Sequence, residues 1–274
     1  LVFATSSVPL IPKFIKGYDL ENVFYINKSF SYISTLFEEL RDKKNIIIVG
    51  GGFIGAEVAE QLAAHKDKNV TLIEAEEYCF TRAFSTELSK LATEQLEQTN
   101  TKVLTSSYVE EIAGENGKVR KVMLKGGKEI DADAVIMSIG YQPNTELAKK
   151  AGLPINHIGA IEVDCYERTT VPDVCAVGDC SQTLGFLTGS TDNIMLASTA
   201  TAEARVLGYN LFGIKIKKNF HGTLGVFSTK INDFSMAAAG INEQKAKNTN
   251  VEFMSAQFTD IDRHPGTLPD ASSL

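Results

Sequence analysis

The sequence predicts an α/β fold built around a parallel sheet, and three successive features carry this prediction. Residues 46–49 form a short apolar run that is typical of a buried strand. A glycine-rich turn follows, and residues 53–65 then have the spacing of a helix. A second apolar run, residues 70–74, ends in an acid. A strand, a turn, a helix and a parallel strand in this order form the unit from which doubly wound sheets are built.

The turn has the spacing Gly-x-Gly-x-x-Gly, which is typical of a dinucleotide site. In that motif Gly50 makes the tight turn, Gly52 lets the backbone approach a pyrophosphate, and Gly55 lets the helix pack closely on the strand. Phe53 and Ile54 begin the helix, whose free N–H groups face the phosphates. The motif alone often marks only a glycine-rich turn, but the strand before it and the helix after it favour a Rossmann-type nucleotide site.

The acid at the end of the second run predicts which nucleotide is bound. Glu74 lies within a few residues of the spacing of about 20 at which a carboxylate accepts hydrogen bonds from the adenosine ribose. A 2′-phosphate would be repelled there, and residues 75–79 contain no lysine or arginine. We therefore expect NAD(H) to be preferred over NADP(H).

The composition is that of an ordinary soluble globular protein. The chain has 274 residues, of which 43% are hydrophobic and 22% charged. Because the net charge is -7 and no dense lysine and arginine cluster is present, a nucleic acid partner is not expected. No apolar run approaches the ~20 residues that a membrane-spanning helix needs, so no membrane partner is expected either.

The cysteines and histidines indicate neither a disulfide framework nor a metal site. Four cysteines in a chain of this length favour a reducing, cytoplasmic setting. Cys175 and Cys180 have a spacing similar to a redox disulfide, but an extended segment would hold their Cα atoms beyond the ~7 Å that a disulfide tolerates. The four histidines are scattered without metal-ligand spacing.

Other patterns predict the remaining elements. Residues 8–12 contain two prolines and indicate an extended connector, with a boundary near residue 12. Turn signals at 114–117 and 126–127 predict an antiparallel meander in place of a helical crossover. The other expected elements are helices over 31–41, 84–98 and 194–211, a helical turn over 243–247, and strands over 102–104 and 134–139, around 161 and 174, and over 225–229 and 234–239.

Several separated motifs together resemble the FAD-dependent pyridine nucleotide-disulfide oxidoreductases. Residues 1–5 resemble the strand and turn that join the flavin and nicotinamide domains, with Ser6 in place of the usual glycine. Residues 136–144 resemble the segment that returns from the nicotinamide domain, and residues 170–179 resemble the second flavin motif. Residues 221–243 are similar to the opening of the interface domain in the NADH oxidase, NADH peroxidase and coenzyme A-disulfide reductase branch.

The resemblance implies a division into four parts. The chain lacks an initiator methionine, and we expect it to be a fragment without the N-terminal FAD half and most of the interface domain. The expected parts are residues 1–11 (end of the first FAD-domain half), 12–138 (NAD(P)-binding Rossmann-like domain), 139–213 (C-terminal part of the FAD domain) and 214–274 (start of the interface or dimerisation domain).

The resemblance also implies further cofactor contacts. On the flavin side these are Thr5, Gly178 and Asp179, whose carboxylate would accept hydrogen bonds from the ribityl chain of FAD. Leu196 and Ala197 would begin a helix whose dipole faces the isoalloxazine ring.

Two more residues would serve the nicotinamide half of NAD(H). Gly140 would lie beside that half, and Glu57 resembles a glutamate that lies next to the nicotinamide and the flavin. An exposed or paired helix glutamate is an equally open interpretation of Glu57.

By resemblance, the parent protein would be a homodimeric enzyme that passes hydride from NADH to FAD and electrons onward to a cysteine-linked acceptor. That acceptor would be oxygen, peroxide, or a disulfide or persulfide. No catalytic residue is assigned, and the fragment alone is expected to be colourless and inactive. The alternatives are a nucleotide-binding module without turnover and a ferredoxin-reductase-type NADH dehydrogenase, which the interface-domain opening at residues 222–223 disfavours.

Overall fold

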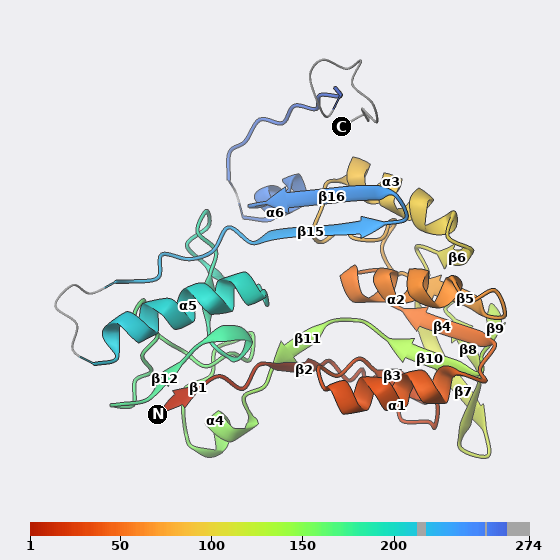
Figure 1. The fold of residues 1–274 in the computed structure, drawn as a ribbon, viewed down its shortest axis with the longest axis horizontal. Coiled ribbons are helices and arrows are strands. Elements are labelled where there is room, and N and C mark those ends of the chain that lie inside the picture. The colour runs from red at the N-terminus through yellow and green to blue at the C-terminus, as the bar shows by residue number, and fades with distance from the viewer. Residues whose placement is uncertain (213–217, 250, 262–274) are drawn as a thin grey trace. The chain divides into compact units, whose positions relative to one another are not determined.

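The computed structural model describes residues 1–212, 218–249 and 251–261, and the chain divides into two compact units, residues 1–240 and 241–274. The first unit contains a five-stranded sheet in the order β3-β10-β4-β5-β6, in which every neighbouring pair is parallel (Figure 1). Its strands are β3 (Val23–Tyr25), β10 (Ala134–Met137), β4 (Asn45–Val49), β5 (Asn69–Ile73) and β6 (Thr101–Leu104). The α/β fold class is thereby confirmed.

Both faces of this sheet are buried, as is usual for a parallel sheet. Successive side chains of a strand point to opposite faces, so Ile46 and Ile48 join one apolar cluster whereas Ile47 and Val49 join a second. Three predicted helices pack on the first cluster: α1 (Phe30–Leu40), α2 (Phe53–Ala63) and α3 (Thr86–Glu97).

The antiparallel meander covers the second cluster and confirms the turn signals. Strands β7 (Val109–Glu115), β8 (Lys118–Leu124) and β9 (Glu129–Asp131) pair in chain order. Ile112 and Val122 of these strands are fully or almost fully buried against the sheet.

Two segments differ from the sequence-based expectation. The expected connector forms strand β2 (Ser7–Pro9), which pairs antiparallel with β11 (Tyr141–Pro143). A two-stranded ribbon consists only of edge strands, and these tolerate proline. Ile161 forms isolated bridges with Ile155 and Ser181 instead of a strand.

Other segments of the first unit, from the N-terminus and from residues 148–180, form a third, smaller apolar cluster. That cluster includes Phe3, Ile161 and Ala176. Further elements of the first unit are β1 (Val2–Phe3), parallel to β12 (Cys175–Ala176), the helix α4 (Glu146–Lys150), the 3-10 turn η1 (Gly178–Cys180), the pair β13 (Thr183–Leu184) and β14 (Thr191–Asp192), and the helix α5 (Ala197–Asn210).

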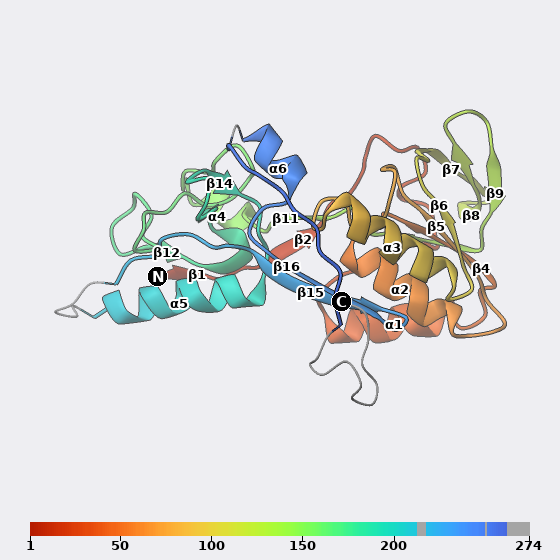
Figure 2. The same ribbon diagram turned by 90° about the horizontal axis from the view of Figure 1, so that it is seen from above.

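A hairpin completes the first unit. Strands β15 (Val226–Ile231) and β16 (Phe234–Ala239) pair antiparallel and contact α2 and α3 (Figure 2). Ile231 and Met236 are buried in the first cluster. The described part of the second unit contains α6 (Glu243–Asn248), and among all described residues no helix is long and apolar enough to cross a membrane.

Candidate nucleotide-binding site

A pocket lies where the strand order of the sheet reverses. The chain proceeds from β4 to β5 and β6 on one side, whereas β10 and β3 lie on the other. Ligands of open α/β sheets bind in the crevice beyond the carboxyl ends of the strands at such a switch point. Here that crevice holds a pocket of about 170 Å³, lined by Pro9, Ile26, Gly52, Phe53, Ile54, Met137, Ser138, Gly140 and Tyr141.

The first and third glycines of the motif are required by the protein's own packing. Gly50 has φ of +106°, and a Cβ on it would lie 2.5 Å from the carbonyl oxygen of Ser138. A Cβ on Gly55 would lie 1.9 Å from the carbonyl oxygen of Gly50. A side chain on Gly55 would therefore push α2 away from the end of β4, and one on Gly50 would push the turn away from the segment that follows β10.

Gly52 differs from these two glycines, because neither its backbone conformation nor the packing around it requires a glycine. Its φ of -77° suits any residue, and a Cβ there would meet no atom within 4 Å. The space in front of Gly52 is therefore open, and it borders the pocket. An open space at the N-terminus of a helix fits the close approach of a phosphate group.

The carboxylate of Glu74 lies at the edge of the glycine turn. Its Oε2 accepts a hydrogen bond of 2.5 Å from the Gly51 N–H, and its Oε1 accepts one of 2.8 Å from the Glu76 N–H. The carbonyl of Gly51 in turn accepts the N–H of Phe80 at 2.9 Å. The turn is thus tied on both sides to the segment that follows β5, which fixes Glu74 beside the glycine turn.

Gly140 and Glu57, the two residues expected near the nicotinamide, have different surroundings. Gly140, with φ of +117°, lines the pocket. Glu57 is exposed, is not among the pocket-lining residues, and accepts a hydrogen bond of 2.8 Å from the Thr229 hydroxyl on β15.

Ser138 is a candidate contact that the sequence did not reveal. It follows β10 and lines the pocket, and its Oγ is buried without a hydrogen-bond partner among the described residues. A buried unpaired hydroxyl costs about 1–3 kcal/mol. An oxygen of a bound nucleotide would offer this group an acceptor.

Cys79 also lies against the glycine turn, but its environment keeps the thiol protonated. The side chain is fully buried, and its Sγ lies 2.7 Å from where a Cβ on Gly51 would be. Burial, with the nearby Glu74 carboxylate as the second cause, raises the pKa of Cys79 to about 12. Cys175 and Cys180 are free thiols as well.

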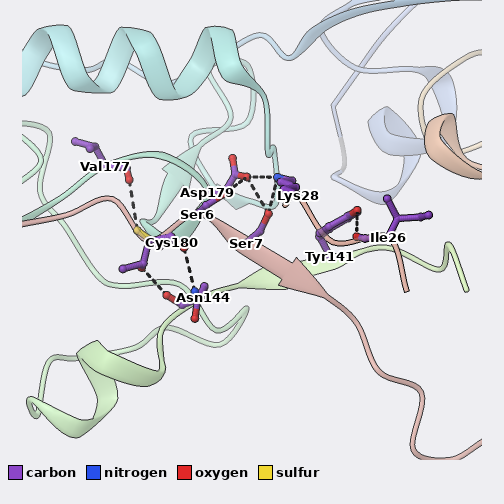
Figure 3. Close-up of polar contacts among 10 residues, drawn as sticks. Ser6, Ser7, Ile26, Lys28, Tyr141, Asn144, Val177, Asp179 and Cys180 are labelled. Carbon is purple, nitrogen blue, oxygen red and sulfur yellow. Dashed lines mark hydrogen bonds and ion pairs between the residues drawn. The ribbon is translucent and has the colours of Figure 1, made fainter. Parts of the chain in front are cut away.

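On the flavin side, Asp179 is the centre of a polar cluster (Figure 3). Its Oδ2 accepts from the Ser7 hydroxyl at 2.8 Å and from Lys28 Nζ at 2.7 Å. Lys28 Nζ also lies 5.0 Å from the ring centroid of Tyr141, which lines the nucleotide pocket. Ser7 and Lys28 were not expected from the sequence, since they lie more than 150 residues before Asp179.

The other residues expected to contact the flavin are Thr5, Leu196 and Ala197. The Thr5 hydroxyl donates to the carbonyl of Asn144 at 2.6 Å. Leu196 precedes α5 without a side-chain capping bond, and Ala197 is exposed at the first helical position. An open N-terminus of a 14-residue helix suits the electron-rich edge of a flavin ring.

Two buried carboxylates lie behind Gly178, the residue before Asp179. Glu203 accepts from the Gly178 N–H at 2.7 Å and from the Thr183 hydroxyl at 2.5 Å. Glu167 is 1% exposed, and its Oε2 has no hydrogen-bond partner among the described residues. Burial, together with the charge of Glu203, raises the pKa of Glu167 to about 9. Burial raises the pKa of Glu203 as well.

A parallel sheet with a glycine turn, a helix N-terminus and a carboxylate at its switch point defines the Rossmann-type α/β class. Within that class, the chain belongs to the pyridine nucleotide-disulphide oxidoreductase family, because the sequence model of that family matches residues 1–204. The family expected from the motifs is thus confirmed.

Two curated relatives and one solved structure illustrate the match. The chain is 32% identical over 277 residues to an NADH oxidase of Enterococcus faecalis, covering 100% of this chain and 60% of that protein. It is 34% identical over 247 residues to an NAD(P)H coenzyme A polysulfide/persulfide reductase of Pyrococcus horikoshii, covering 90% and 54%. The structure of an NAD-dependent persulfide reductase from A. fulgidus superposes with a TM-score of 0.89 at 34% identity, covering 100% of this chain and 50% of that one. The chain therefore spans about half the length of the relatives it matches.

Proposed function

We propose that this chain is the nicotinamide nucleotide-binding part of an FAD-dependent NADH oxidoreductase. The observation that carries the proposal is the switch-point pocket, where the open space at Gly52 and the unpaired hydroxyl of Ser138 meet. Gly50, Gly52, Phe53, Ile54 and Gly55 would hold the pyrophosphate. The names of the relatives, NADH oxidase and persulfide reductase, support the reaction class.

Other residues of the chain would complete the site. Glu74 would accept hydrogen bonds from the adenosine ribose, and Gly140 would lie at the nicotinamide. Glu57 would lie beside the nicotinamide, with its Oε1 held by the hydroxyl of Thr229.

The polar groups and the helix start on the flavin side suit the binding of FAD. Thr5, Gly178 and Asp179 would face its ribityl side, and the helix start at Leu196 and Ala197 would face the ring. When bound, FAD supplies the acceptor for the hydride of NADH. We also propose the division expected from the sequence, into residues 1–11, 12–138, 139–213 and 214–274. We further propose a cytoplasmic homodimer whose acceptor is oxygen, peroxide, or a disulfide or persulfide.

The nucleotide preference tests this proposal. Glu74→Ala removes the charge that repels a 2′-phosphate. The ratio of NADH affinity to NADPH affinity should therefore fall by about tenfold. Isothermal titration of this chain with each nucleotide measures the ratio.

Glu76→Ala is the matched control. It removes an exposed carboxylate two residues away. Glu76 contacts Glu74 through its backbone N–H, which the substitution keeps. The ratio of NADH affinity to NADPH affinity should therefore stay unchanged. Wild-type protein that binds NADPH as tightly as NADH would contradict the role assigned to Glu74.

A further inference from the structure

The β15–β16 hairpin contacts the turn of α2 that carries the proposed nucleotide residues. The ring of Phe227 on β15 lies edge-on to the ring of Phe53, with centroids 5.7 Å apart. Phe53 lines the pocket. Two more rings complete the cluster, since Phe80 and Phe84 lie 5.6 and 5.8 Å from Phe53.

A second contact comes from the same face of the same strand. Thr229 lies two residues after Phe227, so both side chains point to one side of β15. Phe53 and Glu57 are four residues apart and therefore neighbours on one side of α2. The hydroxyl of Thr229 donates to Glu57 Oε1 at 2.8 Å. One face of the hairpin thus holds two adjacent side chains of the proposed site.

The far end of the hairpin is anchored independently of the pocket. The N–H of Asn232 donates to Glu60 Oε1 at 2.6 Å, and its side-chain amide donates to Gln95 Oε1 at 3.2 Å. Ile231 is fully buried in the core of the sheet domain. These contacts fix the strand, so Phe227 and Thr229 meet α2 in a defined register.

We infer that Phe227 and Thr229 are positioning residues, which set the orientation of Phe53 and Glu57 toward the nicotinamide half of the dinucleotide. The inference rests on the proposed function. The adenosine half would contact Gly52, Glu74 and the backbone N–H groups at the start of α2, whereas Phe227 and Thr229 contact the ring of Phe53 and the carboxylate of Glu57. The hairpin should therefore affect the binding of whole NADH but not that of ADP.

The experiment compares Phe227→Leu with Ile231→Val in the chain of 274 residues, by calorimetric titration with NADH and with ADP. Phe227→Leu keeps an apolar side chain but loses the edge of the ring. It should weaken NADH binding by about three- to tenfold, the size of a lost aromatic pair, and leave ADP binding unchanged. Ile231→Val removes a methylene from the same hairpin without touching Phe53, and it should change neither affinity.

Two results would overturn the inference: equal NADH binding by wild type and Phe227→Leu, or a parallel loss of NADH and ADP. A wild-type chain that binds neither ligand would instead overturn the proposed function. Thr229→Val gives a second test without a change in the core. It should weaken NADH binding about twofold, and have no effect in a Glu57→Ala background, because the hydroxyl then has no Glu57 oxygen through which to act.

Discussion

Glu167 shows how one side chain can make stability depend on pH. The pKa of a glutamate carboxyl group in the unfolded chain is 4.5, whereas burial raises the pKa of Glu167 in the folded chain to about 9. Between pH 4.5 and pH 9 the folded chain therefore keeps a proton on Glu167 that the unfolded chain has lost. Stability from this group is fully present below pH 4.5 and falls as the pH rises towards 9.

We predict that Glu167→Gln removes part of this pH dependence. The amide resembles the protonated acid, so the free energy of unfolding should rise at pH 8 by on the order of 2 kcal/mol relative to wild type and be nearly unchanged at pH 5. Urea unfolding at both pH values measures the difference. Glu162→Gln alters an exposed acid nearby and should give the same change at both. If the free energy of unfolding changed from pH 5 to pH 8 by the same amount in wild type and in Glu167→Gln, the raised pKa of Glu167 would be contradicted.

Among the elements, the C-terminal end of α1 depends on a lysine from another segment. Lys68 is 7% exposed and donates to the carbonyls of Leu40, Arg41 and Lys43 at 2.9, 3.1 and 3.0 Å. The last carbonyl groups of a helix have no partner within it, so this one ammonium group satisfies three of the local acceptors.

Lys68→Met keeps the apolar stem but removes the donor that these three carbonyls share; the carbonyl of Leu40 still accepts from the Lys43 N–H at 3.2 Å. We predict a loss of about 1–3 kcal/mol in the free energy of unfolding, measured with urea. Lys66→Met is the control. Because Lys66 is exposed, this substitution should change the free energy of unfolding by less than about 0.5 kcal/mol. Equal stability of the two variants would show that water replaces the Lys68 contacts.

The elements that the sequence predicted well are those with a strong local pattern. Helices α1, α2 and α3 and the meander were expected within a few residues, because apolar spacing and glycine turns are visible over short stretches. Strand β3 was missed since three residues are too few to show a period. The pairing of β2 with β11 joins segments that lie over 130 residues apart and leaves no local signal.

The same reason limits what could be foreseen of the site. The glycine motif and Glu74 follow from spacing along one stretch of chain, and the structure places them together. Lys28, Ser138 and Phe227 reach the site from distant segments, and only the fold brings them there.

For the whole molecule, the nucleotide pocket and the flavin-side cluster are physically connected. Tyr141 lines the pocket, and its hydroxyl donates to the carbonyl of Ile26 at 2.5 Å. Lys28, two residues after Ile26, pairs with Asp179. The ribbon of β2 and β11 runs between the two places, so a nicotinamide at Gly140 and a flavin at Asp179 would share one supporting framework.

The central claim is that the switch-point pocket binds NADH at Gly52, and calorimetric titration of wild type, Gly52→Ala and Gly208→Ala tests it most directly. A Cβ at either glycine would meet no atom of the protein within 4 Å. Both variants should therefore stay within about 1 kcal/mol of wild-type stability. Wild type and Gly208→Ala should bind NADH equally, whereas the methyl group at Gly52 should occupy the phosphate position and weaken binding at least tenfold, about 1.4 kcal/mol. Undiminished NADH binding by Gly52→Ala would contradict the account.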